Sequence, residues 1–127
     1  MRVLIADDSA MMRKVLQRTL AEPGLEIVEA ANGCEALEIL RASRENNQPL
    51  DLILCDINMP VMDGLIFLET AKNEGLVSDT PTVFVTTETG ERMVLRAIAA
   101  GAQGYICKPF TAEQVRDRIA PLLRCAV

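Results

Sequence analysis

The stretch Val3-Leu4-Ile5-Ala6-Asp7-Asp8-Ser9 decides the fold, because a short apolar run there ends in two acidic residues. An apolar run followed by an amphipathic helical pattern occurs five times along the chain. The runs are Val3–Ile5, Leu25–Ala30, Leu52–Cys55, Thr82–Val85 and Tyr105–Cys107. Nearly continuous apolar strands are typical of a parallel sheet that is covered on both faces. The sequence therefore predicts an α/β fold, with a (βα)5 doubly wound open sheet of five parallel strands.

Local signals mark the edges and ends of these elements. Glu26 and Glu29 interrupt the second run, which favours an edge strand. Asn32 followed by Glu35, and Thr111 followed by Gln114, are capping-box patterns that predict where the second and fifth helices begin. Gly101 is expected to end the fourth helix.

Length and composition limit the class of protein. The 127 residues have the length of one domain, so we expect a single domain over 1–127 with no output domain. A net charge of −5 argues against nucleic acid and anionic membrane as partners. No apolar run approaches a membrane span and no signal peptide opens the chain, so a cytoplasmic location is expected. The domain is also expected to be a monomer. Histidine is absent, which excludes imidazole chemistry within the chain.

The four cysteines do not suggest a metal or redox centre. No Cys-x-x-Cys pair occurs among them, so a zinc knuckle or thioredoxin-type site has no support. Cys55 and Cys107 lie in apolar runs and are expected to be small buried hydrophobic residues. A reducing compartment fits this pattern better than a disulfide framework does.

Polar residues follow four of the five predicted strands. Asp7 and Asp8 end the first, Asp56 the third, Thr86 the fourth and Lys108 the fifth. A single aspartate after a strand is ordinarily a turn or capping residue. Parallel strands, however, end at one edge of the sheet, which is where open α/β sheets bind ligands. The sequence therefore predicts that these side chains meet at one site.

The residue types at this site indicate phosphoryl chemistry. Three carboxylates repel one another, and one lysine does not neutralise them, so a divalent cation is expected. Oxygen ligands without histidine or paired cysteine favour Mg²⁺ or Mn²⁺ over zinc. A carboxylate, a hydroxyl, an ammonium and such a cation together can handle a phosphoryl group. Because no nucleotide-binding glycine loop occurs, phosphorylation of an aspartate is favoured over hydrolysis of ATP.

Four motifs resemble the receiver domains of two-component response regulators, over essentially the whole chain. They are Val-Leu-Ile-Ala-Asp-Asp-Ser at 3–9, Asp-Ile-Asn-Met-Pro-Val-Met-Asp-Gly at 56–64, Val-Thr-Thr-Glu at 85–88 and Gly-Tyr-Ile-Cys-Lys-Pro-Phe at 104–110. Within this family the chain looks most like the single-domain response regulators of chemotaxis. The resemblance implies a flavodoxin-like fold with the strand order 2-1-3-4-5.

The resemblance also implies the roles of the acidic residues. Asp56 would be the phosphoacceptor. Asp8 and Asp56 would bind Mg²⁺ directly, together with the backbone carbonyl of Asn58, while Asp7 would act through water or position the ion. Mn²⁺ would be able to substitute. The domain would be a phosphoacceptor that catalyses only its own phosphorylation and dephosphorylation, and not an enzyme on other substrates.

Further roles follow from the same resemblance. Lys108 would contact the phosphoryl group, and Asp56 before phosphorylation. Thr86 would bond to a phosphoryl oxygen while Tyr105 turns inward as the switch. The bond before Pro109 is expected to be cis. Judged from its residue type alone, Tyr105 is more often a half-buried core aromatic with a hydrated hydroxyl.

Residues beside the site are expected to set the lifetime of the acyl phosphate. Asn58 and Glu88 are polar residues that the chemotaxis regulators also carry, and they imply a short lifetime because they let water approach. Thr87 departs from the alanine or glycine that is common in the family. Its larger side chain is expected to narrow access to Asp56.

The implied partners are proteins. A sensor histidine kinase would supply the phosphoryl group, and a target such as a flagellar motor switch protein would read the face made by the fourth helix, fifth strand and fifth helix. A phosphatase is a further implied partner. A stand-alone receiver outside chemotaxis, acting as a phosphorelay intermediate or phosphate sink, is the alternative that stays open.

Two alternatives come from other classes of protein. Asp56-Ile57-Asn58 loosely resembles the Asp-x-Asp motif of haloacid-dehalogenase-like phosphohydrolases, but their motif follows the first strand and its second aspartate is asparagine here. A flavodoxin-like cofactor binder is disfavoured, because Asp7 and Asp8 in the first turn would repel a flavin phosphate.

Overall fold

The computed structural model describes residues 1–125, with side chains up to residue 123. Strands and helices alternate along them, in the order β1 (Arg2–Ala6), α1 (Ala10–Thr19), β2 (Glu26–Ala30), α2 (Gly33–Glu45), β3 (Leu52–Cys55), α3 (Gly64–Asn73), β4 (Thr82–Thr86), α4 (Glu91–Ala100), β5 (Gly104–Cys107) and α5 (Ala112–Cys125). The five apolar runs of the sequence are therefore the five strands.

All the strand pairs are parallel, and the strands lie side by side in the order β2-β1-β3-β4-β5. This order confirms the expected flavodoxin-like fold. The strand that contains Glu26 and Glu29 lies at one edge, where both glutamates are exposed. β1 and β3 lie next to one another in the middle of the sheet, and each alternates its side chains between the two faces.

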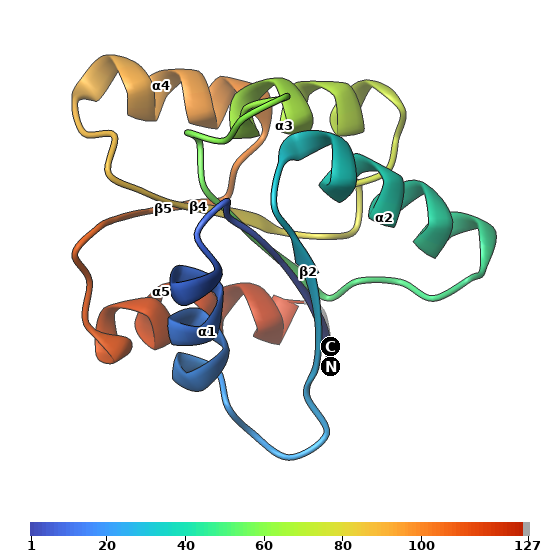
Figure 1. Cartoon of the computed structure of the whole chain (residues 1–127), viewed down its shortest axis with the longest axis horizontal. Coiled ribbons are helices and arrows are strands. Elements are labelled where there is room, and N and C mark those ends of the chain that lie inside the picture. The colour runs from blue at the N-terminus through green and yellow to red at the C-terminus, as the bar shows by residue number, and fades with distance from the viewer. Residues whose placement is uncertain (126–127) are drawn as a thin grey trace.

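Helices cover both faces of the sheet, with α1 and α5 on one side and α2, α3 and α4 on the other (Figure 1). Each face has its own apolar core. Leu4, Ile53 and Phe84 belong to the core beneath α2, α3 and α4. The residues before them in the same strands, Val3, Leu52 and Val83, belong to the core beneath α1 and α5. The described helices are too short and too polar for any of them to cross a membrane.

The predicted helix ends are confirmed. Asn32 accepts a hydrogen bond from the amide of Glu35 at 2.9 Å, and Thr111 accepts one from the amide of Gln114 at 3.1 Å. In both caps the longer side chain bonds back to the backbone at 2.9 Å. Gly101 follows α4 with a φ of 110°, the left-handed conformation that favours glycine.

The prediction for the two cysteines in apolar runs is half right. Cys55 is buried in the core, but Cys107 is exposed. Cys107 is the last residue of β5, which lies at an edge of the sheet. A short apolar run indicates a strand, but it does not show which of its side chains the neighbouring helix covers.

Candidate functional site

The register of the central strands places two acidic residues side by side. Ala6 at the end of β1 pairs with Cys55 at the end of β3, so the next residue of each strand is an aspartate. The amide of Asp56 donates to the carbonyl of Ala6 at 2.9 Å, and the amide of Asp7 donates to Ala30 at 3.0 Å. The backbones of Asp7 and Asp56 are therefore held by neighbouring strands.

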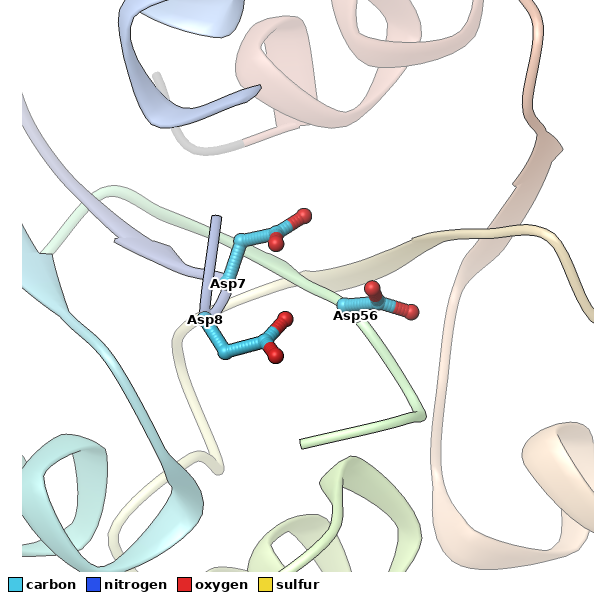
Figure 2. Close-up of side chains that lie close together, drawn as sticks. All are labelled: Asp7, Asp8 and Asp56. Carbon is cyan, nitrogen blue, oxygen red and sulfur yellow. The ribbon is translucent and has the colours of Figure 1, made fainter. Parts of the chain in front are cut away.

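Asp7, Asp8 and Asp56 gather at this carboxyl edge of the sheet. One carboxylate oxygen from each lies within 4.8 Å of the others. Figure 2 shows the three side chains leaving two neighbouring segments of the chain and extending to the same side. Asp7 and Asp56 are buried, whereas Asp8 is exposed. The cluster is thus anchored in the sheet and open to solvent at Asp8.

Lys108 joins two of the carboxylates. Its Nζ atom donates to Asp7 Oδ2 at 2.8 Å and to Asp56 Oδ2 at 3.0 Å. The contact with Asp56 is the one expected before phosphorylation, while the contact with Asp7 is additional. The amide of Lys108 donates to the carbonyl of Thr86 at 2.8 Å, which fixes this lysine at the end of β4. One ammonium group, on the residue that follows β5, therefore joins two of the three carboxylates.

Burial changes the pKa values of the charged groups in this cluster. It raises the pKa of Asp7, because loss of hydration outweighs the hydrogen bonds from Lys108 and Ser9, and the charge on Asp56 adds to the rise. Burial on its own lowers the pKa of Lys108, but its hydrogen bonds to Asp7 and Asp56 outweigh this, so its pKa is raised. The ammonium is therefore charged at neutral pH, and the site is short of positive charge.

The donor set fits a hard divalent cation. Three carboxylates meet with one ammonium, and all the candidate ligand atoms are oxygens. The first-turn cap of α1 is made by Ser9, whose Oγ accepts from the amide of Met12 at 3.2 Å. Among the described residues no hydrogen bond engages the Asp8 carboxylate. Asp8 is thus not used as the helix cap, and its oxygens are available to an ion.

The loop from β3 to α3 shapes the site from the other side. The amide of Asn58 donates to Asp56 Oδ1 at 3.3 Å, and that of Gly64 donates to the carbonyl of Ile57 at 2.8 Å. At Gly64 a Cβ atom would overlap with the carbonyl oxygen of Asp56. Between these points Met62 donates to the carbonyl of Pro60 at 2.7 Å.

That short hydrogen bond encloses Val61, which has a φ of 69°. A three-residue turn with its central residue at positive φ is strained, the more so for a β-branched side chain. Val61 is 81% exposed, so burial of its side chain does not offset the energetic cost of this conformation. The turn is therefore imposed by the contacts on either side of it.

Glu88 connects the site to β5. Its amide donates to Thr86 Oγ1 at 3.2 Å, its carboxylate accepts from the Asn58 side chain at 2.9 Å, and its carbonyl accepts from the Tyr105 hydroxyl at 2.7 Å. Tyr105 also packs edge-on against Phe84 in the core. Burial raises the pKa of Tyr105 to about 12. The hydroxyl of Tyr105 is therefore a donor at neutral pH, and it faces the loop that follows Thr86.

The remaining residues singled out in the sequence lie around the rim. Thr86 is buried and Thr87 is exposed. The peptide bond between Lys108 and Pro109 is cis. The structure thus gathers the expected residues at one edge of the sheet, with Thr87 facing solvent.

Arg13 is a residue that the sequence did not point to. It lies in α1, yet its guanidinium donates to the carbonyl of Asp7 at 2.6 Å and to the carboxylate of Glu29 at 2.9 Å. The helical pattern places Arg13 on a polar face and gives no sign of these contacts. A sign would have been its position in the first turn after an acidic strand end, within reach of the preceding loop.

Comparison with known proteins agrees with this geometry. Residues 3–120 match the model of the response regulator receiver domain family. The chain is 35% identical to a chemotaxis protein CheY homolog of Campylobacter jejuni over 97% of this chain and 92% of that protein. It is 34% identical to the chemotaxis protein CheY1 of Helicobacter pylori, over 97% of each chain.

Solved structures show the same likeness. CheY4 of Vibrio cholerae superposes with a TM-score of 0.83 at 34% identity, covering 96% of this chain and 98% of that one. CheY in a complex with CheX, BeF3 and Mg²⁺ from Borrelia burgdorferi gives a TM-score of 0.83 at 28% identity, covering 95% and 87%. With its strand order, its acidic cluster and these relatives of the CheY type, the chain belongs to the response regulator receiver domain family.

Proposed function

We propose that the domain receives a phosphoryl group on Asp56 from the phosphohistidine of a sensor kinase, in a reaction that depends on Mg²⁺. The observation that carries this proposal is the cluster of three carboxylates at the strand ends, spanned by the ammonium of Lys108. Asp56 and Asp7 each accept a hydrogen bond from Lys108 and from a backbone amide, so Asp56 is assigned as the acceptor because residues 56–64 resemble the family motif that begins with the phosphorylated aspartate.

Asp7, Asp8, Asp56 and the carbonyl of Asn58 would hold the Mg²⁺. When bound, the ion supplies positive charge that neutralises the carboxylates and the oxygens of the transferring group. Asp8 is the exposed member of the cluster, so an ion bound there would be reached by water from this side. The related CheY of Borrelia burgdorferi was solved with Mg²⁺ and BeF3, a group that takes the place of a phosphoryl group, which supports the assignment.

The transfer itself asks little covalent chemistry of the domain. An oxygen of Asp56 attacks phosphorus, the phosphorus–nitrogen bond to the donor imidazole breaks, and the electron pair stays on that nitrogen, which takes a proton. Lys108 would exchange a carboxylate oxygen for a phosphoryl oxygen, since its ammonium is already within 3.0 Å of Asp56. No histidine occurs among the 127 residues, so the phosphohistidine would lie outside them, on the proposed sensor kinase.

Phosphorylation would be read on the face formed by α4, β5 and α5. The Thr86 hydroxyl would donate to a phosphoryl oxygen, and turning toward the site to do so would strain the bond that its oxygen now accepts from the amide of Glu88 at 3.2 Å. The carbonyl of Glu88 accepts a hydrogen bond from the hydroxyl of Tyr105 in β5. Movement of the loop that contains Glu88 would therefore shift the Tyr105 side chain. On this face the apolar side chains of Leu95 and Ile98 in α4 are 59% and 60% exposed, so a partner protein can contact them.

The charge of this face favours an acidic partner. Apart from Lys108, which lies in the site, residues 91–123 carry four basic and three acidic side chains, in a molecule whose net charge is −5. A flagellar motor switch protein in a chemotaxis pathway is the proposed target, because relatives of the chain are chemotaxis proteins. A phosphorelay intermediate or phosphate sink would use the same site without a target on this face.

The experiment that tests the proposal is labelling with acetyl phosphate. The purified protein is incubated with Mg²⁺ and the donor, and its intact mass is measured. We expect one added phosphoryl group, which is lost when EDTA replaces Mg²⁺ and in Asp56→Asn. Asp51→Asn changes an aspartate at the opposite end of β3 and is the matched control, which should label as the wild type does.

A phosphohydrolase would give a different result. It would turn over an added phosphoester and would hold label only transiently during that turnover. Asp56-Ile57-Asn58 follows β3, which is not where the motif of haloacid-dehalogenase-like enzymes lies. Release of phosphate from a simple phosphoester without stoichiometric labelling would overturn the proposed function.

A further inference from the structure

Arg13 links three parts of the molecule with one side chain. It lies in the first half of α1, and its guanidinium reaches back to the loop that follows β1. Nη1 donates to the backbone carbonyl of Asp7 at 2.6 Å, and Nε donates to Oε1 of Glu29, at the end of β2, at 2.9 Å. The side chain of Arg13 is 17% exposed and that of Glu29 is 45% exposed, so the bond to Asp7 is partly shielded from water while the ion pair with Glu29 is open to it.

Every polar group of Asp7 has a hydrogen-bond partner, and Arg13 is the partner of its backbone carbonyl. The amide of Asp7 donates to Ala30, and its carboxylate accepts from the amide of Ser9 at 2.9 Å and from Lys108 at 2.8 Å. Because the peptide unit is planar, fixing the carbonyl of Asp7 also fixes the amide of Asp8. Arg13 therefore sets the direction in which the chain enters Asp8.

Asp8 depends on this backbone support more than its two neighbours do. It is exposed, and among the described residues its carboxylate accepts no hydrogen bond. Asp7 and Asp56, in contrast, are buried and bonded to Lys108. The position of the Asp8 carboxylate relative to Asp56 thus comes from the backbone on either side of it.

We propose that Arg13 is a positioning residue for Mg²⁺, which holds the Asp7–Asp8 peptide so that the Asp8 carboxylate faces Asp56, and that Glu29 orients Arg13 for this task. The inference deepens the proposed function and rests on it. The ordinary reading is a structural ion pair between α1 and β2. Such a pair at a partly exposed site contributes little stability, and it would leave metal affinity unchanged.

The test is the dissociation constant of Mg²⁺, measured by calorimetry on the unphosphorylated protein. Groups that hold metal ligands in place typically change affinity by 10- to 100-fold, so we expect Arg13→Gln to weaken Mg²⁺ binding about tenfold. Arg18→Gln is the matched control. It removes the same charge from an exposed position of α1, five residues further along the helix, and should leave the dissociation constant unchanged.

A double-mutant cycle shows whether the effect passes through Asp8. In an Asp8→Asn background, Arg13→Gln should change Mg²⁺ affinity by much less than tenfold, because the ligand it positions has been removed. An equally large loss in both backgrounds would overturn the role proposed for Arg13. A wild-type dissociation constant for Arg13→Gln would overturn it directly.

Variants of Glu29 keep the inference testable if Arg13→Gln does not fold. Glu29→Gln retains an oxygen for Arg13 and should bind Mg²⁺ as the wild type does, whereas Glu29→Ala releases the guanidinium and should bind several-fold more weakly. Equal affinity in Glu29→Ala and wild type would overturn the inference. A wild-type protein that binds no Mg²⁺ would instead refute the proposed function, and the inference with it.

Discussion

Single residues at this site show a conflict between stability and function, and Asp7 shows it most directly. Its carboxylate is buried, and burial raises its pKa. When folding raises the pKa of a carboxyl group, keeping that group charged destabilises the folded state. This cost is present at every pH above the raised pKa. The cost disappears as the pH falls through the raised value, where the folded protein takes up the proton first.

Replacement of Asp7 should therefore stabilise the metal-free protein. We expect Asp7→Asn to unfold at a higher temperature than the wild type at neutral pH in EDTA, with an advantage that shrinks as the pH is lowered through the folded pKa of Asp7. Asp79→Asn, at an exposed position, is the control and should unfold at about the temperature of the wild type at neutral pH. Thermal unfolding followed by circular dichroism measures both. A less stable Asp7→Asn protein at neutral pH would contradict this account.

Val61 carries strain that a different residue would relieve. Its φ of 69° is unfavourable for a β-branched side chain, whereas asparagine adopts this region readily. We expect Val61→Asn to raise the free energy of unfolding by about 1 kcal/mol. Val61→Ala removes the same exposed side chain but keeps a Cβ atom, and should gain less. Urea denaturation checks the order, and a destabilised Val61→Asn would show that the turn is not strained.

At the scale of elements, the join between β3 and α3 sets the position of Asp56. Gly64 begins α3, and the carbonyl of Asp56 occupies the space where a Cβ atom of residue 64 would lie. Because this neighbour is backbone, it cannot move aside without shifting the strand end. The close approach of the helix to the strand therefore requires glycine.

A methyl group at this position should disturb both the fold and the site. We expect Gly64→Ala to lose about 2 kcal/mol of unfolding free energy, the range found for overpacked cores, and to be labelled more slowly by acetyl phosphate. Ile66→Ala, on the exposed face of the same helix, is the control and should label normally. Equal stability and labelling in Gly64→Ala would mean that the approach is not tight.

The elements were more predictable than the contacts between them. Apolar runs and capping pairs such as Asn32 with Glu35 are local signals, and they were enough to find every strand and several helix ends. The order of the strands was not local information, since periodicity does not say which strands are neighbours, and it came from resemblance to a family. The exposure of Cys107 was missed for the same reason, because burial depends on what packs against an edge strand.

The candidate site divides in the same way. Asp7, Asp8, Asp56 and Lys108 were found because parallel strands bring their ends together. The bonds of Arg13 to Asp7 and of Glu88 to Thr86 and Tyr105 were not found, since they involve backbone atoms that carry no signal in the sequence. The strained turn at Val61 could not be predicted from the sequence either, because only the surrounding contacts impose it.

For the whole molecule, the proposed function changes the net charge of the site in two steps, Mg²⁺ binding and phosphorylation. The side chains of Asp7, Asp8, Asp56 and Lys108 together carry a net charge of −2, which one Mg²⁺ would cancel. Phosphorylation would replace one negative charge on Asp56 by about two. A change of about one charge at the ends of the strands, passed through Glu88 to β5, is the signal that the proposed function requires.

Mg²⁺ should accordingly stabilise the whole fold. An ion that binds only the folded state at about 100 times its dissociation constant contributes about 2.7 kcal/mol, which corresponds to roughly 10 °C in the unfolding midpoint of a domain of this size. Thermal unfolding in Mg²⁺ and in EDTA measures the shift. Asp8→Asn should abolish most of it, and an equal shift in that variant would place the ion elsewhere.

The most direct test of the central claim is to identify the phosphorylated residue. Borohydride reduces an aspartyl phosphate to homoserine, so protein labelled with acetyl phosphate in Mg²⁺ can be reduced, digested and sequenced by mass spectrometry. The account predicts homoserine at position 56 and nowhere else. Homoserine at position 7 or 8, or reduction that leaves Asp56 intact in fully labelled protein, would contradict it.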